Sequence, residues 1–240
     1  MDCLYIRLAT PLQSWAGPAV AGNIVRTERF PTRSGLKGLL AGALGARRGA
    51  WPSWLDEAEF WVRQDRKPYL TDDFQTINPR EESEEFRRRM IIIQGQRVSK
   101  KTLVFTPDAR SGTSIVNRTY LADGEFLVRI AVAGKEDELE DALSSPAFAT
   151  YLGRKAFAPE FPFYLGRGSA NAFTQIPAPL LAHQEANTAQ RPLTCVLYGP
   201  HTSPQGERTQ NLVPVVATQK ERLEKISELL DIRRPLNARA

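Results

Sequence analysis

Basic residues gather around the predicted start of a helix, where they could bind phosphate groups. They are Arg26, Arg29, Arg33 and Lys37. Ser34 has the side chain of a good N-cap, so the sequence predicts Gly35 as the first helical residue. The free N–H groups and the positive dipole end of a helix N-terminus already favour an anion. These residue types at this spacing predict a site for the backbone of a polyanion.

The helix that would carry this site is unusually rich in glycine. Its apolar residues recur at helical spacing and are Leu36, Leu39, Leu40, Ala43 and Leu44. Its glycines are Gly35, Gly38, Gly42 and Gly45. Because an interior glycine costs up to about 1 kcal/mol relative to alanine, they predict unusually close approach of a sheet or of a ligand backbone. The sequence leaves these two explanations equally open.

The distribution of charge supports a polyanion partner more strongly than the net charge of +5 does. Residues 86–122 carry a charge of +7 and residues 26–48 carry +5, which leaves −7 for the rest of the 240-residue chain. Phosphate neutralisation depends on local charge, so two basic regions on an acidic body favour nucleic acid. The alternative is that both regions are solvated faces.

The sequence argues against a membrane protein and against a disulfide-bonded or metal-binding one. The longest mostly apolar run, residues 39–46, is far shorter than the roughly 20 residues that cross a bilayer, and the N-terminus lacks a basic leader. We therefore expect a cytoplasmic protein without a membrane partner. Cys3 and Cys195 lie in apolar runs and are expected to be buried thiols, so the sequence predicts neither a disulfide nor a metal site.

The order of predicted elements indicates an α+β fold. The expected core elements are a strand at 4–8, the glycine-rich helix, strands around 59–64 and 125–132, a helix at 136–148, and strand-like pieces after 192. This order is close to the βαββαβ of ferredoxin-like and RRM-like folds. Residues 69–121 lack a strong apolar period and are expected to form a projecting insertion.

We expect a first domain at residues 1–175 and a C-terminal extension at 176–240. The extension ends in an amphipathic helix that could dock on this chain or on a neighbour.

Aromatic side chains near the N-terminus offer two alternative interpretations. In the first strand, Tyr5 and Arg7 share the face opposite Leu4 and could form a stacking platform. In the loop that follows, Gln13 and Trp15 could pair with and stack on a nucleic-acid base. A Trp15 that plugs the core is at least as compatible with the sequence.

Five segments resemble one family, and they occur in the order found in that family. They are RLATPLQSWAGPAVAGN from Arg7, RFPTRSGLKGLLAGALG from Arg29, DFQT from Asp73, NRTYLADGEFLVRIAV from Asn117, and YLGRKAFAPEFP from Tyr151. On these motifs the chain resembles the CasD family of type I-E CRISPR Cascade subunits, which belongs to the RAMP superfamily of RRM-like proteins. The resemblance runs from about residue 4 to 170, and R-F-P-T-R-S-G-L is its most specific part.

The resemblance implies a non-catalytic subunit that caps the 5′ handle of the guide RNA (crRNA). It also implies a thumb at residues 69–121 that packs on a CasC-like backbone subunit. A contact with the large CasA-like subunit, which reads the protospacer-adjacent motif, would make the contact with target DNA indirect. No cofactor is implied. The candidate RNA-binding residues are Gln13, Trp15, Arg26, Arg33, Ser34, Lys37, Arg97, Lys100, Arg118, Tyr120, Arg154 and Lys155.

The chain departs from the family pattern at two places. Thr119 stands where the family has an acid, and Ala156-Phe157 replaces its usual Ser-Cys. Tyr-Leu-Gly-Arg also occurs twice, from Tyr151 and from Tyr164. The first copy fits the family motif better, and the second is interpreted as a similar turn.

An RNA endonuclease of the same superfamily is the alternative function. Metal-independent RNA cleavage favours histidine as acid and base, but His183 and His201 both lie outside the resembling segments. The glutamates Glu81, Glu82, Glu84 and Glu85 are interleaved with arginines at salt-bridge spacing, and no phosphate-binding loop of the G-x-x-x-x-G-K-[ST] type is present.

Incubation of the purified chain with labelled CRISPR repeat RNA separates the two functions. We expect the RNA to stay full-length on a denaturing gel, with and without divalent metal, because no acid–base pair is predicted near the basic regions. Discrete cleavage products that disappear when His183 and His201 are replaced would establish the endonuclease instead.

Overall fold

A computed structural model describes residues 2–17, 24–77, 114–182, 184, 188–200 and 202–232. The chain divides into two compact units. The first comprises Met1–Gly17, Thr27–Leu70 and Tyr120–Ala240, and the second comprises Pro18–Arg26 and Thr71–Thr119.

The first unit is built on a mixed α+β arrangement around a seven-stranded sheet of described residues. Its strand order is β8-β1-β7-β4-β10-β11-β9. The strands are β1 (Asp2–Ala9), β4 (Glu59–Arg66), β7 (Glu125–Ala131), β8 (Tyr164–Ser169), β9 (Ala178–Pro179), β10 (Gln190–Tyr198) and β11 (Glu207–Val216). The helices are α1 (Arg33–Ala43), η1 (Ser53–Asp56), α3 (Glu136–Ser144), α4 (Ala172–Gln175) and α5 (Gln219–Leu229). The strands predicted at 4–8, 59–64 and 125–132 and the three long helices are therefore confirmed.

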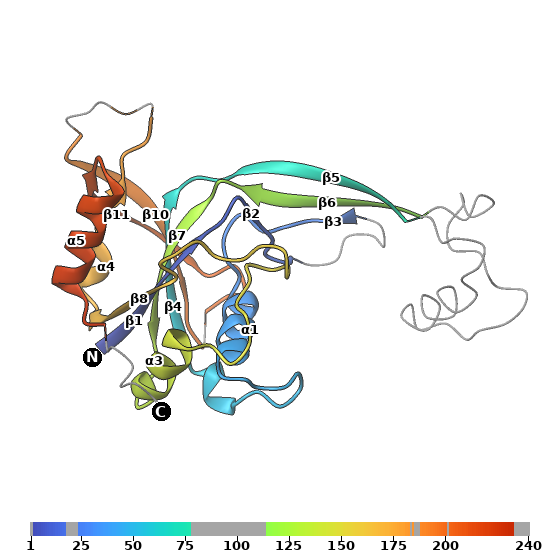
Figure 1. Ribbon diagram of the computed structural model, residues 1–240, viewed down its shortest axis with the longest axis horizontal. Helices are drawn as coiled ribbons and strands as arrows, with labels where there is room; N and C mark the ends of the chain where they lie inside the picture. Colours follow the sequence, from blue (N-terminus) through green and yellow to red (C-terminus); the bar gives the residue numbers. More distant parts are fainter. Residues whose placement is uncertain are drawn as a thin grey trace, which may run out of the picture. The chain divides into compact units, whose positions relative to one another are not determined.

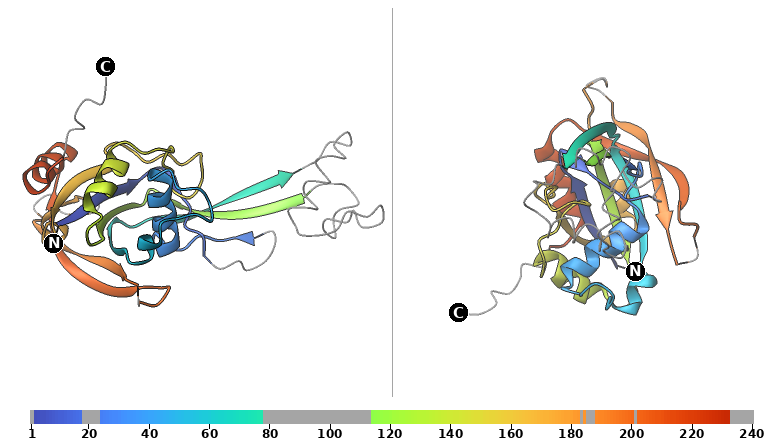
Figure 2. Two further views of the ribbon diagram at one scale, coloured as in Figure 1. Left: turned by 90° about the horizontal axis from the view of Figure 1, so that it is seen from below. Right: turned by 90° about the vertical axis from the view of Figure 1, so that its right-hand side faces the viewer.

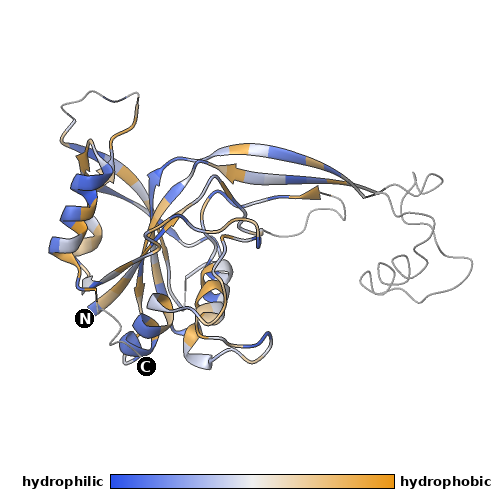
Figure 3. Ribbon diagram, in the orientation of Figure 1, coloured by the Kyte–Doolittle hydropathy of each residue, from blue (hydrophilic) through white to orange (hydrophobic). Residues whose placement is uncertain are grey.

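Helices cover both faces of this sheet (Figure 1). On one face α1 and α3 contribute leucines to the larger core, together with Val62, Val128 and Ile130 of the strands. On the other face α4 and α5 pack over a second core that contains Phe173 and Ile226. Figure 3 shows the hydrophobic colouring mainly on the central strands and α1, whereas α5 is largely hydrophilic. We call these the α1 face and the α5 face.

The structure corrects the prediction that Tyr5 and Arg7 of β1 form a stacking platform, because both lie on the covered α5 face. Tyr5 is fully buried in the second core, and its hydroxyl donates to Ser169 O at 2.6 Å. Arg7 is also buried. The prediction failed because an alternating strand pattern does not reveal that a distant C-terminal helix covers the second face.

The C-terminal hairpin belongs to the main sheet of the first unit. β10 pairs with β4 from Cys195↔Arg63 to Tyr198↔Phe60, which inserts the C-terminal hairpin into the main sheet. α5 docks on this chain through Ile226 and Leu230, which answers the question left open by its amphipathic pattern.

Buried charges tie α5 to the sheet. Arg222 donates to Glu125 on β7, to Asp65 on β4 at 2.6 Å and to Pro177 O at 2.9 Å. Arg7 donates to the same Glu125 at 2.9 Å. Burial alone would raise the pKa of Glu125, but Arg222 and Arg7 outweigh it and lower the pKa to about 2. The carboxylate is therefore held charged in the interior.

The second unit is described only in part. β3 (Ile24–Val25) runs parallel to β6 (Ser114–Ala122), with Ile24↔Asn117 and Val25↔Arg118 in register, and β5 (Tyr69–Ile77) also pairs with β6. Within the first unit, the last residues of β6 pair with β2 (Leu12–Gln13). Most of the predicted insertion, including Arg97 and Lys100, lies outside the described residues.

Within the described part of the chain, every helix is too short or too polar to cross a bilayer.

Replacement of Arg222 by alanine should strongly destabilise the first unit. Glu125 and Asp65 would lose a buried cationic partner, which typically costs about 3–5 kcal/mol in the free energy of unfolding. Urea denaturation measures this loss. Lys220→Ala, which removes an exposed charge from the same helix, should change the free energy by less than about 0.5 kcal/mol. Equal effects of the two substitutions would contradict a structural role of the network.

Candidate nucleic-acid interface

α1 begins at Arg33, two residues before Gly35, the first helical residue predicted from the sequence. Thr32, not Ser34, is the N-cap: its Oγ1 accepts from Gly35 N at 3.2 Å, and its backbone carbonyl accepts from Leu36 N at 2.9 Å. Thr32 has extended backbone dihedrals after Pro31, as an N-cap requires, so Ser34 falls inside the first turn and is exposed. Among the described residues, the N–H groups of Arg33 and Ser34 have no partner, and the first turn contains no acid.

The basic side chains at this helix entrance are not all free to contact a ligand. Arg33 is half-buried and donates to the backbone carbonyls of Asp56 and Ala58, while its Nε has no partner among the described residues. Lys37 forms an ion pair with Asp56, which lowers the pKa of that carboxyl. Both side chains thus fasten α1 to the η1 segment, whereas Arg26 and Arg29, which precede the helix, are exposed.

The structure corrects the prediction that Gln13 and Trp15 project from a loop. Their side chains are 0% and 2% exposed. Trp15 Nε1 donates to Gln13 Oε1 at 3.0 Å, and Gln13 Nε2 donates to Gly124 O at 2.8 Å. All their polar groups are used within the protein, so neither residue can pair with or stack on a base. Trp15 is the plug that the sequence left open as an alternative.

Trp15 holds the entrance loop in place. Its backbone N–H donates to Thr27 Oγ1 at 2.7 Å, and its carbonyl accepts from Glu28 N at 2.7 Å. The indole lies directly against Gly35, where an added Cβ would come within 2.9 Å of the ring. Gly35 therefore permits the close packing of α1 on Trp15.

The remaining glycines of the stretch have different roles. Gly38 is in ordinary contact range of Trp51, and a Cβ at Gly42 would meet nothing within 4 Å. Gly45 has a φ of 73° and ends the helix: its N–H donates to Gly42 O, and the next N–H, of Ala46, donates to Ala41 O. These two bonds form a Schellman motif, which requires a left-handed residue. The glycine pattern was thus a mixture of one close contact, one helix end and two less constrained positions.

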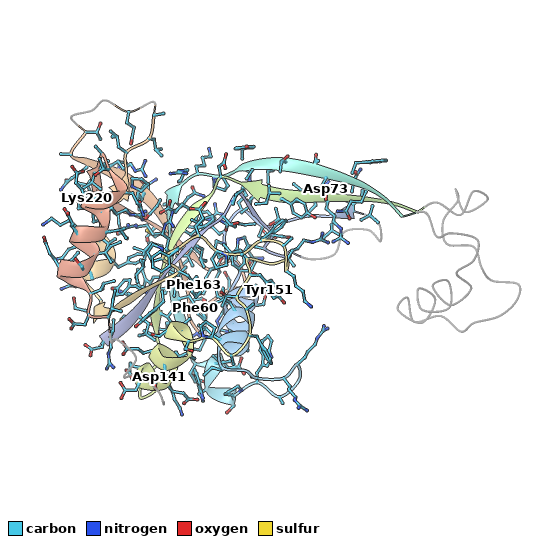
Figure 4. The ribbon with its side chains drawn as sticks, in the orientation of Figure 1. Phe60, Asp73, Asp141, Tyr151, Phe163 and Lys220 are labelled. Atoms are coloured by element: carbon cyan, nitrogen blue, oxygen red, sulfur yellow. The ribbon has the colours of Figure 1, made fainter. Side chains whose placement is uncertain are left out.

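A third segment, residues 151–157, joins the Trp15 loop. Ser14 N donates to Leu152 O at 3.0 Å, and Gly153, with φ of 93°, lies so close to Ser14 O that a Cβ would overlap it at 1.7 Å. Glycine is thereby required at the first Tyr-Leu-Gly-Arg copy. Figure 4 labels Tyr151, where this loop begins.

Arg154 is oriented by an aromatic pair. Its Nη1 donates to the hydroxyl of Tyr120 at 2.8 Å, and its guanidinium lies 5.5 Å from the centroid of the Tyr120 ring. Phe157 packs edge-on against the same ring, with the two ring centroids 5.1 Å apart. Phe157, which stands where the family has Cys, therefore packs against Tyr120. Tyr120 is buried and positions Arg154, whereas Lys155 is exposed beside it.

The second Tyr-Leu-Gly-Arg copy is a strand and not a turn. It forms the start of β8, and Arg167 exchanges two backbone hydrogen bonds with Asp231 at 2.8 and 2.7 Å. The side chain of Arg167 binds Asp2 and Asp137. This copy fastens the segment after α5 to the edge of the sheet.

The structure therefore brings together only part of the predicted set. Three segments meet at the α1 entrance, carrying Gln13 with Trp15, Arg33 with Ser34, and Arg154 with Lys155. Arg26 and Arg118 belong to the second unit, where Arg118 is half-buried in β6 and its Nε has no partner among the described residues. Sequence reasoning missed Thr32 and Asp56; the Pro-Thr pair before the helix was a usable capping signal, but nothing local indicated the anchoring role of Asp56.

Among the described residues, no group of three His, Cys, Asp or Glu side chains is arranged to hold a metal. The carboxylates Asp65 and Glu125 are paired with arginines in the interior.

Comparisons with known proteins agree on one family. A family model described as "CRISPR-associated protein (Cas_Cas5)" matches residues 3–223. The CRISPR system Cascade subunit CasD of Escherichia coli (strain K12) is 32% identical over 179 residues, which span 70% of this chain and 72% of that protein. These findings confirm the resemblance seen in the sequence motifs.

Solved structures support the same relationship. A chain of a CRISPR RNA-guided surveillance complex superposes with a TM-score of 0.68 at 26% identity, covering 94% of this chain and 98% of the other. A Cas protein crystal structure superposes with a TM-score of 0.54 at 26% identity, covering 92% and 96%.

Two glycine substitutions test the packing of the entrance. Gly35→Ala should destabilise the protein, because its Cβ would press on the Trp15 ring at 2.9 Å and on Thr32 Oγ1 at 3.1 Å. Gly42→Ala, in the same helix but in open space, should stabilise it by up to about 1 kcal/mol. Thermal unfolding of both variants measures the difference. A stabilising Gly35→Ala would show that α1 does not depend on close contact with Trp15.

Proposed function

Because this chain belongs to the Cas5 family of CRISPR-associated proteins, we propose that it is a non-catalytic subunit of a Cascade-type complex and holds the 5′ handle of the guide RNA. The observation that carries the proposal is the α1 entrance. Among the described residues, the first N–H groups of this helix have no partner, and its first turn contains no acid. The Trp15 loop packs on that turn, and residues 151–157 are bonded to Ser14 of the same loop. Such an arrangement favours a phosphate.

Each part of the entrance has a distinct task. The N–H groups of Arg33 and Ser34, with the Ser34 hydroxyl, are available to a phosphate oxygen. The exposed Arg29 and Lys155 supply charge from the flanking segments. The buried Gln13 and Trp15 fix the positions of these segments instead of touching RNA.

The strand order supports an RRM-like core. β8-β1-β7-β4 is a continuous antiparallel run, with α1 between β1 and β4 in the chain and α3 between β7 and β8. This arrangement supports the βαββαβ order that the sequence predicted. On this proposal, β10, β11 and α5 are additions to an RRM-like core.

The second unit is proposed to serve the thumb function implied by the resemblance. Its chain segments include the basic insertion, with Arg97, Lys100 and Arg118, and also Pro18–Arg26 with Arg26. Contacts with a backbone subunit and a large subunit, and indirect contact with target DNA, belong to this proposal. We also propose that the protein is located in the cytoplasm.

The buried carboxylate of Glu125 is poorly suited to acid–base cleavage of RNA. A general acid or base works best with a pKa near the operating pH. Arg222 and Arg7 hold the pKa of Glu125 at about 2 despite its burial, so this group stays a structural anion near neutral pH.

Substitution at Ser34 tests the anion site independently of protein stability. Ser34→Asp should stabilise α1 by about 0.3–1 kcal/mol, because an acid in the first turn complements the helix dipole. The same charge should weaken binding of fluorescent handle RNA by about tenfold, as expected for roughly 1.4 kcal/mol of repulsion.

The matched control is Gln219→Glu, which adds an acid to the first turn of α5 on the other face of the sheet. Fluorescence anisotropy at several salt concentrations compares the variants, since phosphate contacts appear in the salt dependence. Equal RNA affinity of the two variants would exclude the α1 entrance as the handle site.

A further inference from the structure

Part of the α1 face of the sheet remains uncovered by helices. Figure 2 shows the β10–β11 hairpin, in orange, to one side of α1 and α3. The hairpin is firmly held, because β10 pairs with β4 through four residues and with β11 through eight. A surface on it is therefore presented by a rigid sheet.

The strand register identifies the side chains on this surface. Val196 faces the larger core under α1, and its partner across the hairpin is Arg208. Residues directly opposite each other share a face, and every second residue along a strand does so too. The α1 face of the hairpin beyond the core therefore presents a row from each strand, which we call the hairpin platform: Gln190, Pro192 and Thr194 from β10, and Arg208, Gln210 and Leu212 from β11.

The exposure of these residues confirms the assignment. Thr194 is half-buried and the other five are exposed, including Leu212 at 61%. On the opposite face of the same strands, Cys195 and Val213 are buried.

Arg208 joins the platform to the α1 entrance. Its guanidinium lies 5.8 Å from the centroid of the Phe30 ring. Phe30 is the buried residue of the entrance loop and immediately follows the exposed Arg29. Arg208 therefore contacts the entrance loop, in which the exposed Glu28 and Arg29 precede Phe30.

We propose that the hairpin platform binds a single-stranded segment of the guide RNA that continues from the α1 entrance. This inference rests on the proposed function and extends its site to a part of the chain without sequence motifs. Arg208 would contact a phosphate, while the amides of Gln190 and Gln210 would contact base edges.

The chemistry of the platform favours RNA over an acidic or basic protein partner. The platform contains amides, a hydroxyl and one arginine, and none of its six residues is acidic. The nearest acid on β11, Glu207, lies on the opposite face because it pairs with Leu197. Single-stranded nucleic acid needs this combination of positive charge with donors and acceptors for unpaired bases.

Photo-crosslinking in the assembled complex, purified with its guide RNA, tests the proposal directly. A photoreactive p-benzoylphenylalanine in place of Gln210 should crosslink to RNA. In place of Thr209, which is exposed on the α5 face one residue away, it should not. In parallel, Arg208→Gln should weaken binding of single-stranded handle RNA by about three- to tenfold and reduce the log–log salt slope by about 0.7. Lys220→Gln, which removes the same charge from α5, should leave both unchanged.

The outcomes separate this inference from the proposed function. If guide RNA co-purifies but position 210 crosslinks to protein or to nothing, the platform is not an RNA site and the α1 entrance is unaffected. An Arg208→Gln variant with wild-type affinity and salt slope would overturn the platform in the same way. If no RNA accompanies the complex, both the proposed function and this inference fail.

Discussion

The contact between Trp15 and Gly35 is the constraint on which the arrangement of the candidate site depends. A large indole is buried directly under the first turn of α1, and only a residue without a side chain allows the helix to approach it. The same tryptophan residue is bonded to Thr27 and Glu28, and its neighbour Ser14 binds Leu152. One aromatic side chain and its loop thereby connect the entrance loop, the helix and the Arg154 segment.

Most residues of the R-F-P-T-R-S-G-L motif have a structural role in this arrangement. Phe30 enters the core, Thr32 caps the helix, Arg33 fastens it to Asp56 and Ala58, and Gly35 receives Trp15. Only Ser34 and Arg29 remain exposed. In this motif, most side chains shape the site and few are left to contact a ligand.

Local patterns predicted the elements of the fold but not how they pack together. The strand at 4–8 and helices α1, α3 and α5 were predicted because hydrophobic periodicity depends only on residues close together in the sequence. The burial of Gln13, Trp15 and Tyr5 was not, because the groups that bury them, including Gly124 and α5, come from far along the chain. The placement of Arg208 over Phe30 likewise depends on the register of the β10–β11 hairpin, for which no local signal exists. Site residues were therefore recognised by type, while their roles as ligands or supports could be assigned only from the structure.

The two faces of the sheet use arginine in opposite ways. On the α5 face, Arg7, Arg63 and Arg222 are buried and neutralised by Asp65 and Glu125. Breaking such a network is costly, so these charges are committed to holding the helix on the sheet. On the α1 face, Arg29 and Arg208 are exposed, and Arg208 lies over the Phe30 ring. Because a phosphate competes poorly for an arginine already paired in the interior, the exposed Arg29 and Arg208 are better placed than Arg222 for the RNA contact that we propose.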